Sequence, residues 1–168
     1  MQLYIRQKAF SWRDRFTVKD AQGNDRWFAQ GELFTWGRKL HVYDARGNEA
    51  AFIHKKLWTF FEQKYFIELA GRPMDPPLAL VKELRFFKRS YYLEGLPCRM
   101  DGDFWAHEYS MYIENGGEVM RISKEWFTWG DSYCIEIANP VNELLCLCVT
   151  LAVDCMNADE AAAASAAT

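Results

Sequence analysis

The sequence lacks an apolar stretch of the length that a membrane-spanning helix needs. Such a helix takes about 20 consecutive apolar residues. The longest apolar run here, from Leu144 to Val153, is interrupted by Thr150 and has about half that length by the same measure. The segment from Met1 to Lys8 also lacks the apolar core of a secretory signal peptide. We therefore expect a cytoplasmic protein without a transmembrane segment.

Cysteine and histidine are too few and too scattered for a disulfide framework or a metal centre. The chain has five cysteines, an odd number without framework spacing, which fits a reducing compartment. Its three histidines are His41, His54 and His107. Asp103, His107 and Glu108 cluster, but at most two of them can share one face of a strand. This pattern favours a hydrogen-bonded structural histidine over a metal ligand, and we predict no metal and no cofactor.

Sequence motifs of common enzymes are also missing. There is no phosphate-cradling Gly-Lys-Ser/Thr loop, no dinucleotide fingerprint and no nucleophile elbow. Gly130-Asp131-Ser132 is faintly similar to a hydrolase serine motif. It stands, however, where an earlier copy of an internal repeat has Gly37-Arg38-Lys39. The sequence therefore predicts a protein that is not an enzyme.

An aromatic motif repeats along the chain, and turn signals repeat with it. The motif occurs three times at a spacing of 24 residues and returns in weaker or later copies, as Phe10-Ser11-Trp12, Phe34-Thr35-Trp36, Trp58-Thr59-Phe60, Phe86-Phe87 and Phe127-Thr128-Trp129. Each copy precedes an alternating, strand-like run. The segments 20–24 and 44–48 are near copies of one turn, and Asn115-Gly116-Gly117 is a third turn signal. Repeated strand–turn–strand units of this kind predict an all-β meander, sandwich or barrel.

One apolar helix is expected near the end of the chain, from about Asn142 to Met156. Asn139 is a suitable N-cap and Pro140 suits the first helical position. A helix that is apolar on every side is either buried all round or lies in a membrane, and the shortness of this one favours burial. In a small β-rich domain, a sheet wrapped around the helix provides that burial. We predict one domain, 1–157, followed by an Ala-rich, mobile tail, 158–168.

The sequence resembles the LURP-one-related family, over about residues 2–157. The matching segments are Leu3–Trp12, Gly31–Leu40, Gly102–Tyr109, Ile122–Asp131 and the closing apolar helix. The family shares the fold of the tubby C-terminal domain and the phospholipid scramblases, and the short chain is similar to its compact prokaryotic members. The resemblance implies a β-rich (α+β) fold, a roughly twelve-stranded closed β-barrel around a central hydrophobic C-terminal helix.

The charge distribution leaves two interpretations open. Residues 1–100 hold 18 Lys/Arg and 11 Asp/Glu, whereas residues 101–168 hold 2 and 12. Either basic strands pair with acidic segments, or a basic face is available to an anionic ligand. Tubby domains bind phosphoinositides through a basic pocket, but no motif transfers its residues to this chain. The candidate anionic-ligand surface consists of basic residues interleaved with aromatic ones: Lys55, Lys56, Lys64, Lys82, Lys88 and Arg89. The alternative is that the aromatic side chains fill the barrel and the lysines protect strand edges.

The function predicted from these observations is that of a non-catalytic, cytosolic binding or scaffold module. Its partner in the first interpretation is an anionic lipid head group or a membrane surface, because cations beside aromatic side chains suit that interface. In the second it is a protein–protein interaction scaffold in a stress or defence response, with no small ligand. The net charge of −3 argues against nucleic acid as a partner.

Overall fold

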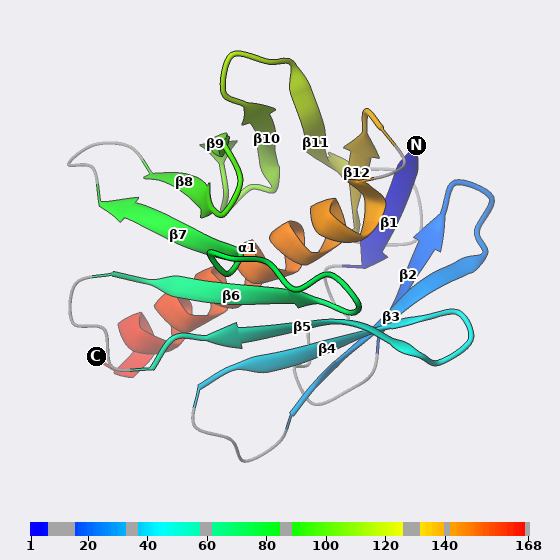
Figure 1. Cartoon of the computed structure of the whole chain (residues 1–168), viewed down its shortest axis with the longest axis horizontal. Helices are drawn as coiled ribbons and strands as arrows, with labels where there is room; N and C mark the ends of the chain where they lie inside the picture. Colours follow the sequence, from blue (N-terminus) through cyan, green and yellow to red (C-terminus); the bar gives the residue numbers. More distant parts are fainter. Residues whose placement is uncertain are drawn as a thin grey trace.

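The computed structural model of the chain describes residues 1–6, 16–32, 37–57, 62–84, 89–125, 132–139 and 142–166. The repeated aromatic motifs, Pro140, Lys88 and most of Gly130-Asp131-Ser132 lie outside the described residues. The described residues form twelve antiparallel strands that close into one barrel, with a single helix inside it (Figure 1). The predicted fold class is therefore confirmed.

Each strand pairs with its neighbours in sequence, and β1 closes the barrel by pairing with β12. The elements are β1 (Gln2–Arg6), β2 (Phe16–Asp20), β3 (Asp25–Gly31), β4 (Lys39–Asp44), β5 (Glu49–Lys55), β6 (Lys64–Leu69), β7 (Ala79–Leu84), β8 (Arg89–Glu94), β9 (Cys98–Asp103), β10 (Glu108–Ile113), β11 (Glu118–Glu125), β12 (Ser132–Ile137) and α1 (Glu143–Ala166). A closed barrel has no free sheet edge, so the idea that lysines protect strand edges is wrong for these strands.

Alternation along the strands separates the inside of the barrel from its outside. In β4, Leu40 and Val42 are buried, while Lys39, His41 and Tyr43 are half-exposed. In β5, Ala51 and Ile53 are buried in the same way. This two-residue period is the one that the sequence shows, and it directs one set of side chains towards α1.

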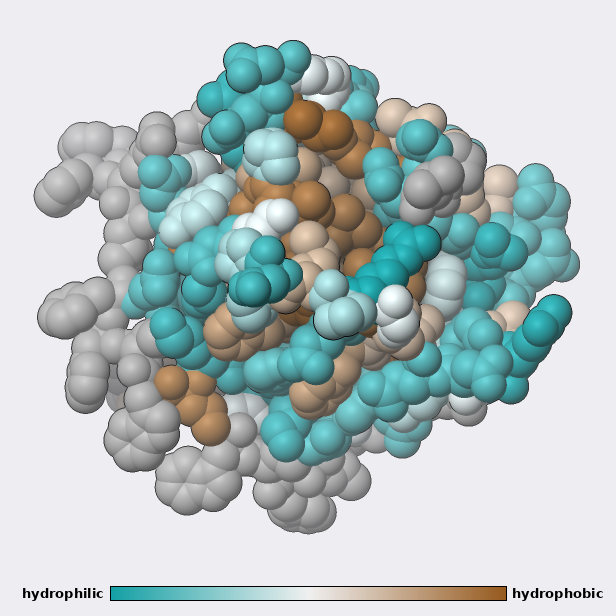
Figure 2. Space-filling model, in the orientation of Figure 1, coloured by the Kyte–Doolittle hydropathy of each residue, from teal (hydrophilic) through white to brown (hydrophobic). Residues whose placement is uncertain are grey.

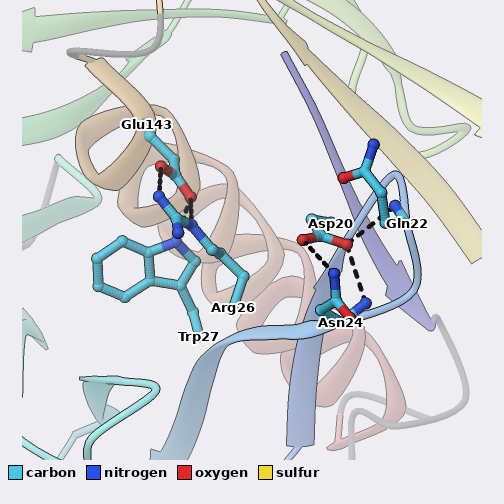
Figure 3. A network of polar contacts seen from close by, with 6 residues as sticks. All are labelled: Asp20, Gln22, Asn24, Arg26, Trp27 and Glu143. Atoms are coloured by element: carbon cyan, nitrogen blue, oxygen red, sulfur yellow. Dashed lines mark hydrogen bonds and ion pairs between the residues drawn. The ribbon is translucent and has the colours of Figure 1, made fainter.

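The near-copy turns of the repeat have the same hydrogen-bond chemistry. The Oδ1 atom of Asp20 accepts the backbone N–H groups of Gln22 and Asn24, each at 2.9 Å (Figure 3). The Asp44 carboxylate accepts the corresponding N–H groups of the second turn, at 2.9 and 2.8 Å. The glycine in each turn has a positive φ, of 82° and 87°. The sequence repeat thus predicts two equivalent hairpin turns correctly, because the interactions that make them are local.

These two turns give the barrel an expected sensitivity to acid. Side-chain hydrogen bonds from Asn24 and Asn48 are the main cause that lowers the pKa of Asp20 and Asp44 below the ordinary value of 3.8. A carboxyl whose pKa is lower in the folded protein stabilises it above the unfolded pKa and loses that effect as pH falls through the folded pKa. We therefore expect the free energy of unfolding to decrease below about pH 4. In urea titrations at a series of pH values, the Asn24→Ala/Asn48→Ala variant should lose less unfolding free energy than the wild type as the pH falls below about 4. The same pH dependence in both proteins would contradict the role of these two hydrogen bonds.

The helix α1 fills the centre of the barrel (Figure 1). Every residue from Cys146 to Val153 has an exposure of 0%. The polar member of this run, Thr150, donates its hydroxyl to the Cys146 carbonyl at 2.9 Å, so its polar group is satisfied within the helix. Among the described residues, no helix has both the length and the apolar character to cross a membrane. The prediction of a helix buried on all sides is confirmed.

The start of α1 agrees with the predicted start near Asn142, but its N-cap and its C-terminal end differ from the prediction. The helix begins at Glu143, later than the N-cap predicted at Asn139, whose backbone carbonyl instead accepts the N–H of Asn142 at 3.0 Å. It continues to Ala166 through the segment that the sequence predicts as a mobile tail. Alanine has the highest helix propensity, and Asp159 in this segment forms ion pairs with the barrel. Both features favour a longer helix.

Candidate functional site

The direction of α1 distinguishes the two ends of the barrel. Because the strands alternate in direction, the odd-numbered strands end, and the even-numbered strands begin, at the end where α1 finishes. We call this end the C-terminal rim. Its described parts are 37–39, 55–57, 63–65, 82–84, 103–108 and 158–166. The opposite end, the N-terminal rim, carries the turns 21–24, 45–48, 70–78, 95–97 and 114–117 and the first turn of α1.

Basic side chains of the C-terminal rim converge on two carboxylates of α1. The Nζ atom of Lys55 donates to Asp159 Oδ2 at 2.6 Å, and Arg38 Nε donates to Asp159 Oδ1. The Tyr65 hydroxyl also donates to Asp159 Oδ2, at 2.9 Å. The Asp159 side chain is only 15% exposed. The next residue of α1, Glu160, pairs with Lys82, and both of these side chains are 14% exposed.

The environment of the cluster shifts the pKa values of Asp159 and Tyr65 in opposite directions. Burial by itself would raise the pKa of the Asp159 carboxyl, but hydrogen bonds from Lys55, Arg38 and Tyr65 outweigh it and hold that pKa below its ordinary value. Burial is also the main cause that raises the pKa of Tyr65 far above its ordinary value. Tyr65 therefore stays protonated and serves as a donor. In the structure, the donors of this cluster therefore hold a carboxylate of their own chain.

The residues predicted from the sequence as an anionic-ligand surface do not form one cluster. Lys55 and Lys82 lie in the site just described, and Lys56 follows β5 at the same rim. Lys64 pairs instead with Glu94, and its Nζ lies 5.3 Å from the centroid of the Phe66 ring. The other two candidates lie outside the part of the chain that the structure describes: Lys88 as a whole and Arg89 with its side chain.

Sequence reasoning missed two donors of the site, Arg38 and Tyr65, and both of its acceptors. Arg38 belongs to a repeat copy and Tyr65 to an alternating strand, so neither stands out as functional. One signal was present in the sequence: Asp159 and Glu160 are adjacent acids that follow a long apolar run. Two adjacent carboxylates at the end of a buried helix require partners on the surrounding barrel.

At the N-terminal rim, side chains of β3 bind the first turn of α1. Arg26 donates from Nε and Nη2 to the two carboxylate oxygens of Glu143, at 2.8 and 3.0 Å, and Trp27 Nε1 donates to Oε1 at 2.7 Å (Figure 3). The Glu143 side chain is 8% exposed and stands in the first turn of α1, where the helix dipole favours a negative charge. Ion pairs from the first half of the chain therefore hold both ends of the helix.

A buried network ties the middle of α1 to β12 and to the turn between β9 and β10. His107 Nε2 and Asp154 Oδ1 lie 2.9 Å apart, and the Tyr133 hydroxyl donates to the other carboxylate oxygen. The His107 and Tyr133 rings stack with their centroids 4.5 Å apart. Nearby, Asn157 Nδ2 donates to the backbone carbonyl of Phe104 at 2.8 Å. His107 thus has the structural role that the sequence analysis favours.

The other two histidines belong to a row of stacked rings on the outer face of β4, β5 and β6. Phe52 lies between His41 and His54, at centroid distances of 4.7 and 5.0 Å. His41 Nε2 lies 2.9 Å from a Glu32 oxygen, and His54 Nε2 lies 2.8 Å from a Glu68 oxygen. The ring faces contact one another, so the row stabilises cross-strand pairing. Across the described ranges, no group of three His, Cys, Asp or Glu side chains is arranged to hold a metal ion.

Apolar side chains are visible on one face of the molecule. Figure 2 shows them in the middle of the face that Figure 1 presents, over α1 and between the neighbouring strands. Separately, half-buried apolar side chains at the N-terminal rim pack against the core: Leu69, Met74, Leu96, Leu144 and Leu145. A hollow of about 410 Å³ lies nearby, where Gln2, Glu118, Val119, Glu136 and Ile137 form part of its lining. The lining combines two carboxylates with the ammonium group of Met1, which donates to the Ile137 carbonyl, and Glu118 pairs with Arg121.

Comparison with known proteins places the chain in a family. The model of the LURP-one-related family matches residues 1–154. The uncharacterized protein YxjI of Bacillus subtilis (strain 168) is 30% identical over 155 residues, which cover 92% of each chain. The solved X-ray structure of a protein from Arabidopsis thaliana superposes with a TM-score of 0.56 at 13% identity, over 88% of each chain, and so shares the fold. The chain belongs to the LURP-one-related family.

Proposed function

We propose that this protein is a non-catalytic binding module that recognises anionic lipid head groups at its C-terminal rim. The observation that carries the proposal is the convergence of Arg38, Lys55 and Lys82 at the end of α1. Two apolar side chains of the same rim, Leu57 and Trp105, are each 46% exposed. Cations next to exposed apolar and aromatic side chains suit a membrane–water interface.

The filled interior supports a site on the outside of the barrel. α1 occupies the space in which small barrels hold a ligand, and its central residues have no exposure. A ligand therefore has to bind at a rim or on the outer face. Of the two rims, the C-terminal one brings three cations together at the end of α1, Arg38, Lys55 and Lys82, whereas Arg26 of the N-terminal rim pairs with Glu143 in the first turn of the helix.

The exposed apolar side chains lie close to the charged cluster. A Cβ atom added at Gly37 would stand 2.9 Å from Leu57 Cδ2, so the Leu57 side chain lies against the residue that precedes Arg38. Trp105 follows Phe104, whose carbonyl accepts the hydrogen bond from Asn157 of α1. Both apolar groups are thus connected to the part of the barrel that surrounds the last turns of the helix. The C-terminal rim thus has both cations and exposed apolar side chains.

Vesicle sedimentation tests this proposal. Each lysine near an anionic surface contributes about 1 kcal/mol, so Lys56→Gln should weaken binding to phosphatidylserine vesicles by about fivefold at low salt. Arg46→Gln, the matched control, removes a charge from an exposed turn of the opposite rim and should leave binding unchanged. Wild-type protein that fails to sediment with anionic vesicles, or an equal loss in the control, contradicts the proposal. A stoichiometric protein partner bound without lipid would favour the scaffold function instead.

A further inference from the structure

We propose that the C-terminal rim contains a phosphate-binding site that Asp159 and Glu160 of the same chain occupy, and that an incoming phosphate group displaces the last turns of α1. This inference rests on the proposed function, since it takes an anion as the ligand. It goes further by naming the donors of the site and by giving the site an internal competitor. The source of the phosphate, a lipid head group or a soluble compound, is left to the experiment.

The donors are suited to a phosphate and are held by the rigid part of the molecule. Arg38 immediately precedes β4, Lys55 ends β5, Tyr65 lies in β6 and Lys82 lies in β7. One guanidinium, two ammonium groups and one protonated phenol all donate towards the same end of α1. A phosphate monoester carries up to about two negative charges and three acceptor oxygens. It can therefore replace the two carboxylates without changing the charge balance of the site.

The occupant, by contrast, comes from the part of α1 that is least enclosed by the barrel. From Cys146 to Asn157 the helix is buried, and Asp154 and Asn157 are fixed to the β9–β10 turn. Residues 158–160 are half-buried, and 161–166 are exposed. Ion pairs of Asp159 and Glu160 hold this last segment to the barrel. Helix ends open locally at a small free-energy cost, so release of these three ion pairs frees the segment without unfolding the core.

Calorimetric titration with inorganic pyrophosphate tests the site directly. If Asp159 and Glu160 fill the site for more than about nine-tenths of the time, Asp159→Asn/Glu160→Gln should bind the probe about tenfold or more tightly than the wild type. The matched control is Asp25→Asn/Glu118→Gln, which changes the net charge equally and releases two cations, Lys19 and Arg121, from their carboxylates away from the C-terminal rim. The control should show no comparable gain.

A third variant tests whether the tighter binding of pyrophosphate depends on the donors of the site. Adding Arg38→Gln to the Asp159→Asn/Glu160→Gln variant should remove the tighter binding. Equal gains in the test and control variants, or no gain in the test variant, overturn the inference. Thermal unfolding provides a second readout, because pyrophosphate should raise the midpoint of the test variant more than that of the wild type. If the test variant does not fold, Glu160→Gln alone can replace it, because it keeps the contacts of Asp159. It should bind pyrophosphate more tightly than the wild type, by a smaller factor. Unchanged affinity in this variant also overturns the inference.

Vesicle binding, compared with pyrophosphate binding, tests the internal competitor and the membrane function independently of each other. Phosphatidic acid presents a phosphate monoester on a membrane, and phosphatidylserine presents a diester with a carboxylate. Tighter binding of the Asp159→Asn/Glu160→Gln variant to phosphatidic acid vesicles supports both proposals. Tighter binding to pyrophosphate without vesicle binding supports the site and contradicts the membrane function. Equal vesicle binding by wild type and variant, with no pyrophosphate gain, contradicts the internal competitor and leaves the membrane function standing.

Discussion

Leu147→Asp is expected to abolish folding of the barrel. Leu147 has no solvent exposure and lies in the central part of α1, enclosed by the strands. Removing a buried leucine side chain costs about 2–5 kcal/mol, and an unpaired buried carboxyl group adds several more. Domains of this size have total stabilities of about 5–15 kcal/mol. The combined loss therefore equals or exceeds the whole free energy of unfolding.

Leu144→Asp is the matched control for this change. Leu144 is half-buried in the first turn of the same helix, where a negative charge interacts favourably with the helix dipole. We expect the Leu144→Asp protein to remain folded, with a cooperative urea transition and the circular dichroism of a β protein. If Leu147→Asp also gives a cooperative transition and the wild-type spectrum, then α1 is not the centre of the core.

The sequence was sufficient to predict the central helix because its signal is independent of the rest of the chain. A run that is apolar on every side admits few environments, and its length excluded the membrane. The ends of the helix were predicted less well. The helix extends to Ala166, past the ion pairs that Asp159 forms with Arg38 and Lys55, which lie more than 100 positions earlier in the sequence. Contacts over such separations leave no local pattern.

The unequal charge of the two halves of the chain follows from the same arrangement. Acidic residues of α1 pair with basic residues of the first half: Glu143 with Arg26, Asp159 with Arg38 and Lys55, and Glu160 with Lys82. The interpretation in which basic strands pair with acidic segments is thus confirmed for these residues. In the anionic-ligand interpretation, a ligand then has to compete with Asp159 and Glu160 for these basic side chains.

The candidate site shows where sequence reasoning stops. Lys55 and Lys82 were recognised because cations stand out among aromatic residues. Tyr65 was not recognised, because the sequence shows it only as one more core aromatic residue in an alternating strand. Burial raises its pKa and so keeps its hydroxyl protonated as a donor. The four donors come from consecutive strands or their ends, and only the curvature of a closed barrel points them at a single helix terminus. The hairpin turns, in contrast, were predictable because five neighbouring residues contain all of their interactions.

Gly102→Ala is expected to cause the largest loss of stability among small substitutions in the strands. Gly102 lies opposite Tyr109 in the β9–β10 ladder and has a φ of 137°. A Cβ atom there would stand 2.4 Å from the Glu108 carbonyl oxygen and 2.5 Å from Tyr109 Cα. Both neighbours are backbone atoms, so the strands have to separate. Forced overpacking costs about 1–3 kcal/mol, and positive φ strain adds about 1–2 kcal/mol more.

Gly23→Ala isolates the backbone part of this effect. Gly23 also has a positive φ, of 82°, but a Cβ atom there would meet nothing within 4 Å. It should lose only about 1–2 kcal/mol in urea titrations, clearly less than Gly102→Ala. The β9–β10 turn also holds α1 through His107 and the Phe104 carbonyl, so Gly102→Ala should speed amide exchange near Asp154 as well. Equal losses in the two variants would mean that the close approach of β9 and β10 is not a constraint on the fold.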